Sequence, residues 1–259
     1  GALLGTNYGT PPYSEWIRAI TVTHLLDHTA GGWNNKRDDP MFDHSDLDHA
    51  DLISWVLDNR PPENAPGTHH DYSNFGYCLL GRVIEVVHGK PYEESVRELV
   101  LEPVGIRDMH IAGDTRDEVQ ENEVAYGRGG ERPYSIPVAR MDAHGGWIAS
   151  PTDLLRFVTR VDGFDTVPDL LKPETTQTMS TPAEASPRYA KGWAINPADN
   201  WWHSGSLPGT GSILVRAHNG FCWAVVTNHR GKDTFGADLD LLTWWILREV
   251  REWPEGWLL

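Results

Sequence analysis

Residues 66–85, PGTHHDYSNFGYCLLGRVIE, decide the fold more than any other stretch of this chain. Apolar side chains recur at helical spacing from Phe75 and Leu79 onwards, and Gly89 stands where a left-handed residue commonly ends a helix. The pattern predicts a helix that closes at this glycine. It is preceded by a polar loop, and Tyr72 lies at the junction of loop and helix.

The segments around this helix are mainly helical or irregular. Amphipathic spacing, helix-start residues and Gly or Pro stops predict further helices. Residues 1–16 form a Gly/Pro/Tyr-rich loop, and residues 107–144 are a long irregular region. The expected helices cover 20–27, 49–60, 91–106 and 151–158.

The final third of the chain changes character. Three segments are short, rich in aromatic and β-branched residues, and separated by Gly/Pro turns, which is typical of sequential antiparallel strands. These segments are NWWHSGS (200–206), SILVRAH (212–218) and FCWAVVTN (221–228). A helix over 236–253 follows, and its expected apolar face consists of Leu239, Leu242, Ile246 and Val250.

These elements predict an α+β fold in a single domain over 1–259. Residues 1–190 are expected to form a mainly helical and loop subdomain. Residues 191–259 are expected to form a three-stranded meander with a C-terminal helix.

The composition of the chain excludes some classes of binding partner. The formal net charge of −15 repels phosphate backbones and anionic lipid, so nucleic acid is a poor partner. No apolar run reaches the roughly 18 residues of a membrane span. A small neutral or cationic substrate fits the charge better. We interpret the N-terminus as a cut or processed end, and the sequence indicates no compartment.

Three segments in this order resemble the superfamily of serine β-lactamases, penicillin-binding proteins and family VIII esterases. They are ITVTHLLDHTAGG (20–32), PGTHHDYSNFGYCLLGRVIE (66–85) and HSGSLPGTG (203–211), and GGWIASPTDLLRF (145–157) falls where that family also has a glycine pair. The resemblance implies a β-lactamase/transpeptidase-like fold, in which an antiparallel sheet is flanked by helices and carries an inserted helical subdomain.

The resemblance also implies the catalytic residues. Tyr72 of Tyr-x-Asn is expected beside the nucleophile as the base, and Asn74 is expected to orient the substrate carbonyl or a lysine. His203 stands where classical members have the lysine of Lys-Thr-Gly. Because a phenol has an unperturbed pKa of about 10, Tyr72 needs nearby cations to act as a base at neutral pH. We expect Tyr72 and His203 to face each other across a groove, with room for a hydroxyl between them.

The rest of the expected site follows His203 on its strand. Ser204 belongs to the His-Ser-Gly triplet. Position 205 is expected to need a small residue such as Gly205, because the substrate acyl group lies along this strand edge. The backbone N–H of Ser206 is expected to form half of an oxyanion hole.

The chain departs from the family pattern in one respect. Ser-x-x-Lys, which carries the nucleophile in the family, does not occur, because Trp, Val, Asp, Arg and His stand three residues before the five lysines. We expect that segment upstream of Gly1, together with two strands that pair beside 221–228. The isolated chain should then be inactive. A separate N-terminal chain or a swapped copy should cover the open strand edge.

The function expected from the resemblance is hydrolysis through a serine acyl-enzyme. A largely neutral histidine at position 203 favours an ester or a D-amino-acid peptide over a carboxylate-bearing β-lactam-like substrate. One alternative is a non-catalytic ligand-binding or peptidoglycan-binding protein.

A metal-dependent hydrolase is a third possibility. His69-His70-Asp71 and Asp43-His44 lack a third ligand in register, and His24 with His28 is expected to pack beside the site. No metal or other cofactor is predicted.

Overall fold

The helical half of the chain is built around α4 (Asn74–His88). The computed structural model describes residues 2–36, 38–126, 132–231 and 235–253. Helix α4 begins where the Ser73 hydroxyl accepts the Gly76 N–H at 3.0 Å, and it ends at Gly89, whose φ is +77°. Phe75 and Leu79 of α4 are buried. The helix predicted from sequence is confirmed.

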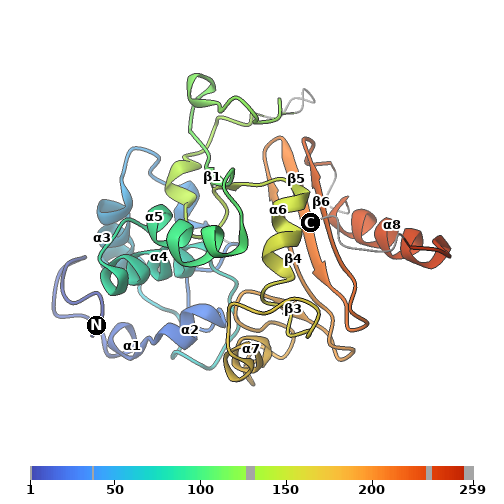
Figure 1. The fold of residues 1–259 in the computed structure, drawn as a ribbon. Coiled ribbons are helices and arrows are strands. Elements are labelled where there is room, and N and C mark those ends of the chain that lie inside the picture. The colour runs from blue at the N-terminus through green and yellow to red at the C-terminus, as the bar shows by residue number, and fades with distance from the viewer. Residues whose placement is uncertain (1, 37, 127–131, 232–234, 254–259) are drawn as a thin grey trace.

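Three other helices of this half, α2 (Val22–Leu26), α3 (His49–Asn59) and α5 (Tyr92–Val96), pack around α4 (Figure 1). The helix predicted over 91–106 is regular only at its start and continues as π and 3-10 turns through Val104. One helix was missed in the expected N-terminal loop, because it has five residues and buries none of them. This helix is α1 (Glu15–Ala19).

The C-terminal half contains a four-stranded antiparallel sheet of order β3-β4-β5-β6. The three predicted strands are confirmed, and the two-residue β3 was missed because two residues carry no periodicity. The strands are β3 (Ala194–Ile195), β4 (Trp201–Leu207), β5 (Thr210–Arg216) and β6 (Cys222–Thr227). A second, two-stranded sheet joins β1 (His110–Ile111) to β2 (Trp147–Ile148). Part of the predicted irregular region, residues 127–131, lies outside the described residues.

Helices cover both faces of the four-stranded sheet (Figure 1). Because side chains alternate along a strand, Leu214 of β5 packs on the side of α6 (Pro151–Val158), while Ile213 packs on the side of α8 (Phe235–Glu249). His203 of β4 is paired with Leu214. It therefore shares the α6 side of the sheet. The remaining helix, α7 (Pro173–Ser180), was not predicted.

The packing face of α8 differs from the predicted one. Leu239, Trp244 and Leu247 pack against the sheet, whereas Leu242 and Ile246 are exposed. Trp244 meets Trp223 of β6 edge to face at a centroid distance of 4.7 Å, whereas the neighbouring Trp245 is exposed, so the Trp244–Trp223 contact sets the rotation of the helix. No helix in the described ranges is long and apolar enough to cross a bilayer.

A buried histidine in the segment before β2 makes the fold sensitive to acid. Both ring nitrogens of His144 are shielded from solvent and lack a hydrogen-bond partner among the described residues. Burial lowers the pKa of His144 to about 3. In the unfolded chain the ordinary pKa is about 6.5. At a pH between these two pKa values, His144 is protonated in the unfolded chain but not in the folded protein. The free energy of unfolding therefore decreases as the pH falls through this range.

We predict that His144→Leu flattens the acid limb of the stability profile. The variant should lose up to about 1.4 kcal/mol per pH unit less than the wild type as pH falls from 6.5 towards 3. At pH 7 it should be at least as stable, because no unsatisfied polar atom is buried. Urea unfolding at several pH values measures this, with exposed His69→Leu as the control. Equal acid slopes for wild type and His144→Leu would contradict the prediction.

Candidate active site

A direct hydrogen bond joins the two residues that the sequence analysis expected to face each other. Tyr72 Oη lies 3.1 Å from His203 Nε2, although the residues are 131 positions apart. Tyr72 comes from the loop before α4, and His203 comes from β4. The contact leaves no room for a hydroxyl between the two groups, which differs from the expected arrangement.

The loop that carries Tyr72 is tied to the segment after α2. The N–H of Asp71 donates to His28 O at 2.8 Å, and the N–H of Asn35 donates to Tyr72 O at 2.9 Å. The N–H of Ser73 donates to His28 Nδ1 at 3.1 Å. These bonds fix the backbone on both sides of the phenol before α4 begins.

Asn74 is anchored within the helical half. Its N–H donates to Asn35 Oδ1 at 2.7 Å, and its Nδ2 donates to Asp39 Oδ2 at 2.7 Å. Asp39 is buried, and burial raises the pKa of its carboxyl group against the lowering effect of hydrogen bonds from the Met41 N–H and the Asn74 amide. The sequence analysis missed Asp39 and Asn35, because both lie in a polar loop without a recognisable motif. The role of Asn74 towards a substrate stays a prediction.

Burial keeps the tyrosine–histidine pair neutral. It raises the pKa of Tyr72, and the Asp39 carboxylate raises it further. It lowers the pKa of His203, against the effect of a hydrogen bond to the Ser204 backbone. The Lys191 amine, two residues beyond Tyr189, is bound to Asp27 Oδ1 at 3.1 Å. With both groups uncharged at pH 7, the Tyr72 hydroxyl can donate to an unprotonated Nε2.

Several aromatic rings pack against the Tyr72 ring. The centroid of the His28 ring lies 4.1 Å from that of Tyr72, so His28 packs beside the pair as expected. Burial lowers the pKa of His28 to about 3, which keeps this ring neutral too. Tyr189, which the sequence analysis missed, meets the Tyr72 ring edge to face at 5.8 Å. The Tyr189 hydroxyl lowers the pKa of both Tyr72 and Tyr77 against the raising effect of burial. Tyr77 Oη donates to Leu26 O at 3.0 Å.

The residues after His203 continue along β4. Ser204, Gly205 and Ser206 are exposed and pair with β5. A Cβ atom at Gly205 would lie 2.8 Å from Ser212 Oγ, so a larger residue here would force the Ser212 side chain on the neighbouring strand to rotate away. By strand alternation the side chains of Ser204 and Ser206 point to the face opposite His203. Only their backbone groups can therefore share its surroundings, and their substrate role stays a prediction.

No group of three His, Cys, Asp or Glu side chains placed to hold a metal ion occurs among the described residues. His69 Nδ1 instead lies 2.9 Å from the Thr68 hydroxyl.

Comparison with known proteins identifies the family. A family model described as Beta-lactamase matches residues 11–244. The chain belongs to this beta-lactamase family, whose members are serine hydrolases. The sequence resemblance and the fold class are thereby confirmed.

The similar proteins include a penicillin-binding protein and an esterase. Penicillin-binding protein 4 of Amycolatopsis lactamdurans is 25% identical over 250 residues, which cover 87% of this chain and 64% of that protein. Esterase EstB of Burkholderia gladioli is 31% identical over 140 residues, 49% of this chain and 35% of that protein. The chain thus spans less than two thirds of the length of these curated relatives.

A solved structure shows the same fold. The D-stereospecific amidohydrolase from Streptomyces sp. superposes with a TM-score of 0.72 at 22% identity. The match covers 93% of this chain and 77% of that one.

We predict that Tyr189→Phe raises the pKa of Tyr72 above its already raised value. The Tyr189 hydrogen bond lowers the pKa of Tyr72, because a donor stabilises a phenolate more than a phenol. NMR titration of the ¹³Cζ signal of Tyr72 measures the change. Tyr13→Phe, which removes a hydroxyl bonded to Tyr8 O, is the control. An unchanged or lower pKa in Tyr189→Phe would contradict the prediction.

Proposed function

We propose that this chain carries the tyrosine–histidine half of an acyl-transfer site that hydrolyses small esters or D-amino-acid amides and peptides. The observation that carries the proposal is the 3.1 Å hydrogen bond between Tyr72 and His203. It joins the Tyr-x-Asn and His-x-Gly elements across the two halves of the molecule. In the proposed site Tyr72, Asn74 and His203 are catalytic. Ser204, Gly205 and the N–H of Ser206 line the acyl group.

The chemistry needs a serine and a lysine from outside these 259 residues, which contain no Ser-x-x-Lys. The serine oxygen bonds to the acyl carbon while its proton passes towards Tyr72, whose phenolate form a neighbouring ammonium favours. The leaving alcohol or amine takes that proton. Water then releases the acyl group from the serine. Without the ammonium, the raised pKa of Tyr72 keeps the phenol protonated.

The unpaired edge of β6 supports the proposal that a segment from outside the 259 residues completes the sheet. Among the described strands β6 pairs only with β5, so one edge is open. We propose that an N-terminal segment, a separate chain or a swapped copy adds strands to β6. Exposed apolar side chains also form a stripe on α8, which we call the α8 stripe, and two of them line a hollow with Asn196 and Asn200 at the β3–β4 turn. The α8 stripe consists of Leu241, Leu242, Trp245 and Ile246.

The charge of the site supports the substrate class. His203 is neutral at pH 7, because burial lowers its pKa, and the Asp39 carboxylate acts on Tyr72. A substrate carboxylate finds less attraction here than beside a lysine. Esters and amides are therefore favoured over carboxylate-bearing β-lactams. The names of the Burkholderia esterase and the Streptomyces amidohydrolase describe those proteins and support the same two classes.

A second candidate is a binding protein without catalysis. The neutral pair offers hydrogen bonds to a ligand without moving a proton. Acylation by a serine-directed probe separates the two candidates.

We predict that a fluorophosphonate probe labels the protein isolated at its natural length from its source cells, and that it does not label the 259-residue chain. Tyr72→Phe in the longer form should slow labelling by about 10²-fold or more, and Tyr13→Phe should not. The short chain should leave p-nitrophenyl acetate intact. Turnover by the short chain that Tyr72→Phe abolishes would contradict the external nucleophile. Absence of labelling together with saturable binding of a D-amino-acid amide would favour the binding protein.

A further inference from the structure

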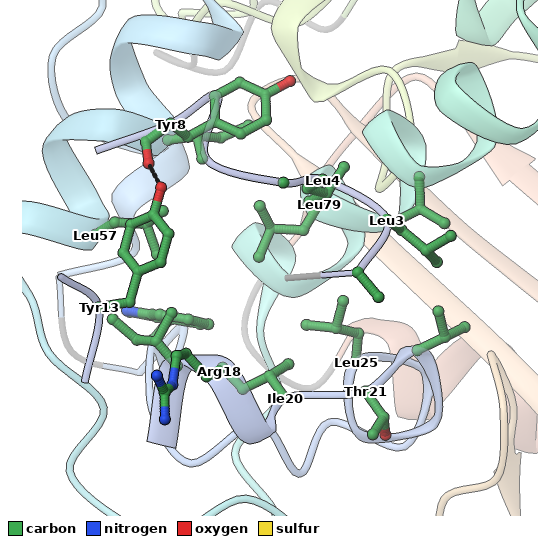
Figure 2. Close-up of a pocket in the computed structure, with 17 residues that line it drawn as sticks. Leu3, Leu4, Tyr8, Tyr13, Arg18, Ile20, Thr21, Leu25, Leu57 and Leu79 are labelled. Atoms are coloured by element: carbon green, nitrogen blue, oxygen red, sulfur yellow. Dashed lines mark hydrogen bonds between the residues drawn. The ribbon is translucent and has the colours of Figure 1, made fainter. Parts of the chain in front are cut away.

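An apolar cavity of about 340 Å³ opens on the side of the helical half where the chain begins. Residues of the first loop, α1, α2, α3 and α4 form its walls. Figure 2 shows Leu4, Leu25 and Leu79 around its centre. Neither Tyr72 nor His203 lines it, so this cavity is separate from the candidate active site.

The inner wall of the cavity offers few free hydrogen-bonding groups. Trp33 Nε1 donates to Arg60 O at 2.8 Å, and Tyr13 Oη donates to Tyr8 O, so the donors of these lining side chains are used within the protein. The Tyr8 hydroxyl turns away from the cavity in Figure 2. Water held inside would find few of the two to four polar partners that it needs. The space therefore favours an apolar occupant.

Two polar side chains with spare hydrogen-bonding capacity, Arg18 and Thr21, lie along one edge of the cavity. Arg18 and Thr21 are exposed, and their polar atoms turn away from the apolar centre in Figure 2. The Arg18 guanidinium has no hydrogen-bond or ion-pair partner within the described ranges. Thr21 Oγ1 accepts the His24 N–H and keeps its own proton to donate. A guanidinium and a hydroxyl at the mouth complement one carboxylate.

The mouth also extends the apolar surface outward. Leu3 and Val22 line the cavity, and their side chains are 44% and 37% exposed. Apolar side chains that rim a cavity mark an interaction site more often than isolated exposed ones do. An alkyl chain that enters the cavity would cover both of them.

We propose that this cavity binds the alkyl chain of an unbranched monocarboxylate and that Arg18 holds the carboxylate at the mouth. At roughly 30 Å³ for each water-sized group, the space accepts about eleven groups. That corresponds to a fatty acid of about eight to ten carbons. The proposal is independent of the acyl-transfer site, because it uses none of its residues.

We predict a chain-length dependence in calorimetric titrations of the 259-residue chain with butanoate, hexanoate, octanoate, decanoate and tetradecanoate below their micelle concentrations. Each added CH₂ should lower Kd about fourfold until the cavity is full. Affinity should stop rising at about ten carbons. Affinity that ignores chain length, or that still rises at the same rate up to tetradecanoate, would overturn the proposal.

Two variants locate the site. Val83→Phe fills the cavity from α4 and should abolish octanoate binding, whereas Val87→Phe on the same helix, at a side chain 70% exposed, should not. Arg18→Gln should weaken octanoate binding two- to fivefold, as expected for an exposed ion pair, and leave 1-octanol binding unchanged. Octanoate binding to a folded Val83→Phe at unchanged affinity would overturn the proposal.

A measurement on the unmodified chain tests the proposal even if the Val83→Phe variant does not fold. In methyl NMR spectra, octanoate should shift the signals of Leu25, Ile53 and Leu79, which line the cavity. Shifts confined to Leu241, Leu242 and Ile246 would place the alkyl chain on the α8 stripe and overturn the proposal.

Discussion

The hydrogen bond between Tyr72 and His203 connects the two halves of this molecule at one polar point. The phenol can reach the imidazole only because the loop before α4 is tied to the segment after α2, and because strand alternation turns His203 towards the α6 side of the sheet. The His28 and Tyr189 rings pack against the phenol and limit its freedom. Each half thus supplies one of the two side chains of this hydrogen bond.

Burial determines the charge of this pair. The same surroundings raise the pKa of Tyr72 and lower the pKa of His203, so both groups lose their charged forms. A tyrosine base needs the opposite effect, which a nearby ammonium would supply. The Lys191 amine is engaged with Asp27. In the proposed acyl-transfer site, the cation that favours the phenolate would therefore come from another segment.

Apolar surface in this structure lies in two places with different geometries. The α8 stripe is a convex helix face, which suits the side chains of another chain segment. The cavity behind α2 is concave, and the Arg18 guanidinium and the Thr21 hydroxyl stand at its mouth. A chain segment suits the first surface, and a slender amphiphile suits the second. Shape, more than hydrophobicity, distinguishes the two occupants.

Local patterns in the sequence determined the main elements. Helical spacing with Ser73 as the cap and Gly89 as the stop defined α4, and β-branched segments between turns defined β4, β5 and β6. These features depend on backbone geometry over a few residues. The ordered motifs also indicated the family and selected Tyr72 and His203 as candidates. The direct contact between these two was not predicted, because motifs order residues along the chain and do not fix distances.

Tertiary structure alone decided the remaining features. Tyr189, Asp39 and Asn35 reach Tyr72 or Asn74 from segments without a motif, since their partners lie far away in the sequence. The rotation of α8 followed from the contact of Trp244 with Trp223, which periodicity cannot register. The pKa values of Tyr72 and His203 depend on burial and on neighbouring charges. Both are properties of packing, and a sequence specifies packing only through the complete fold.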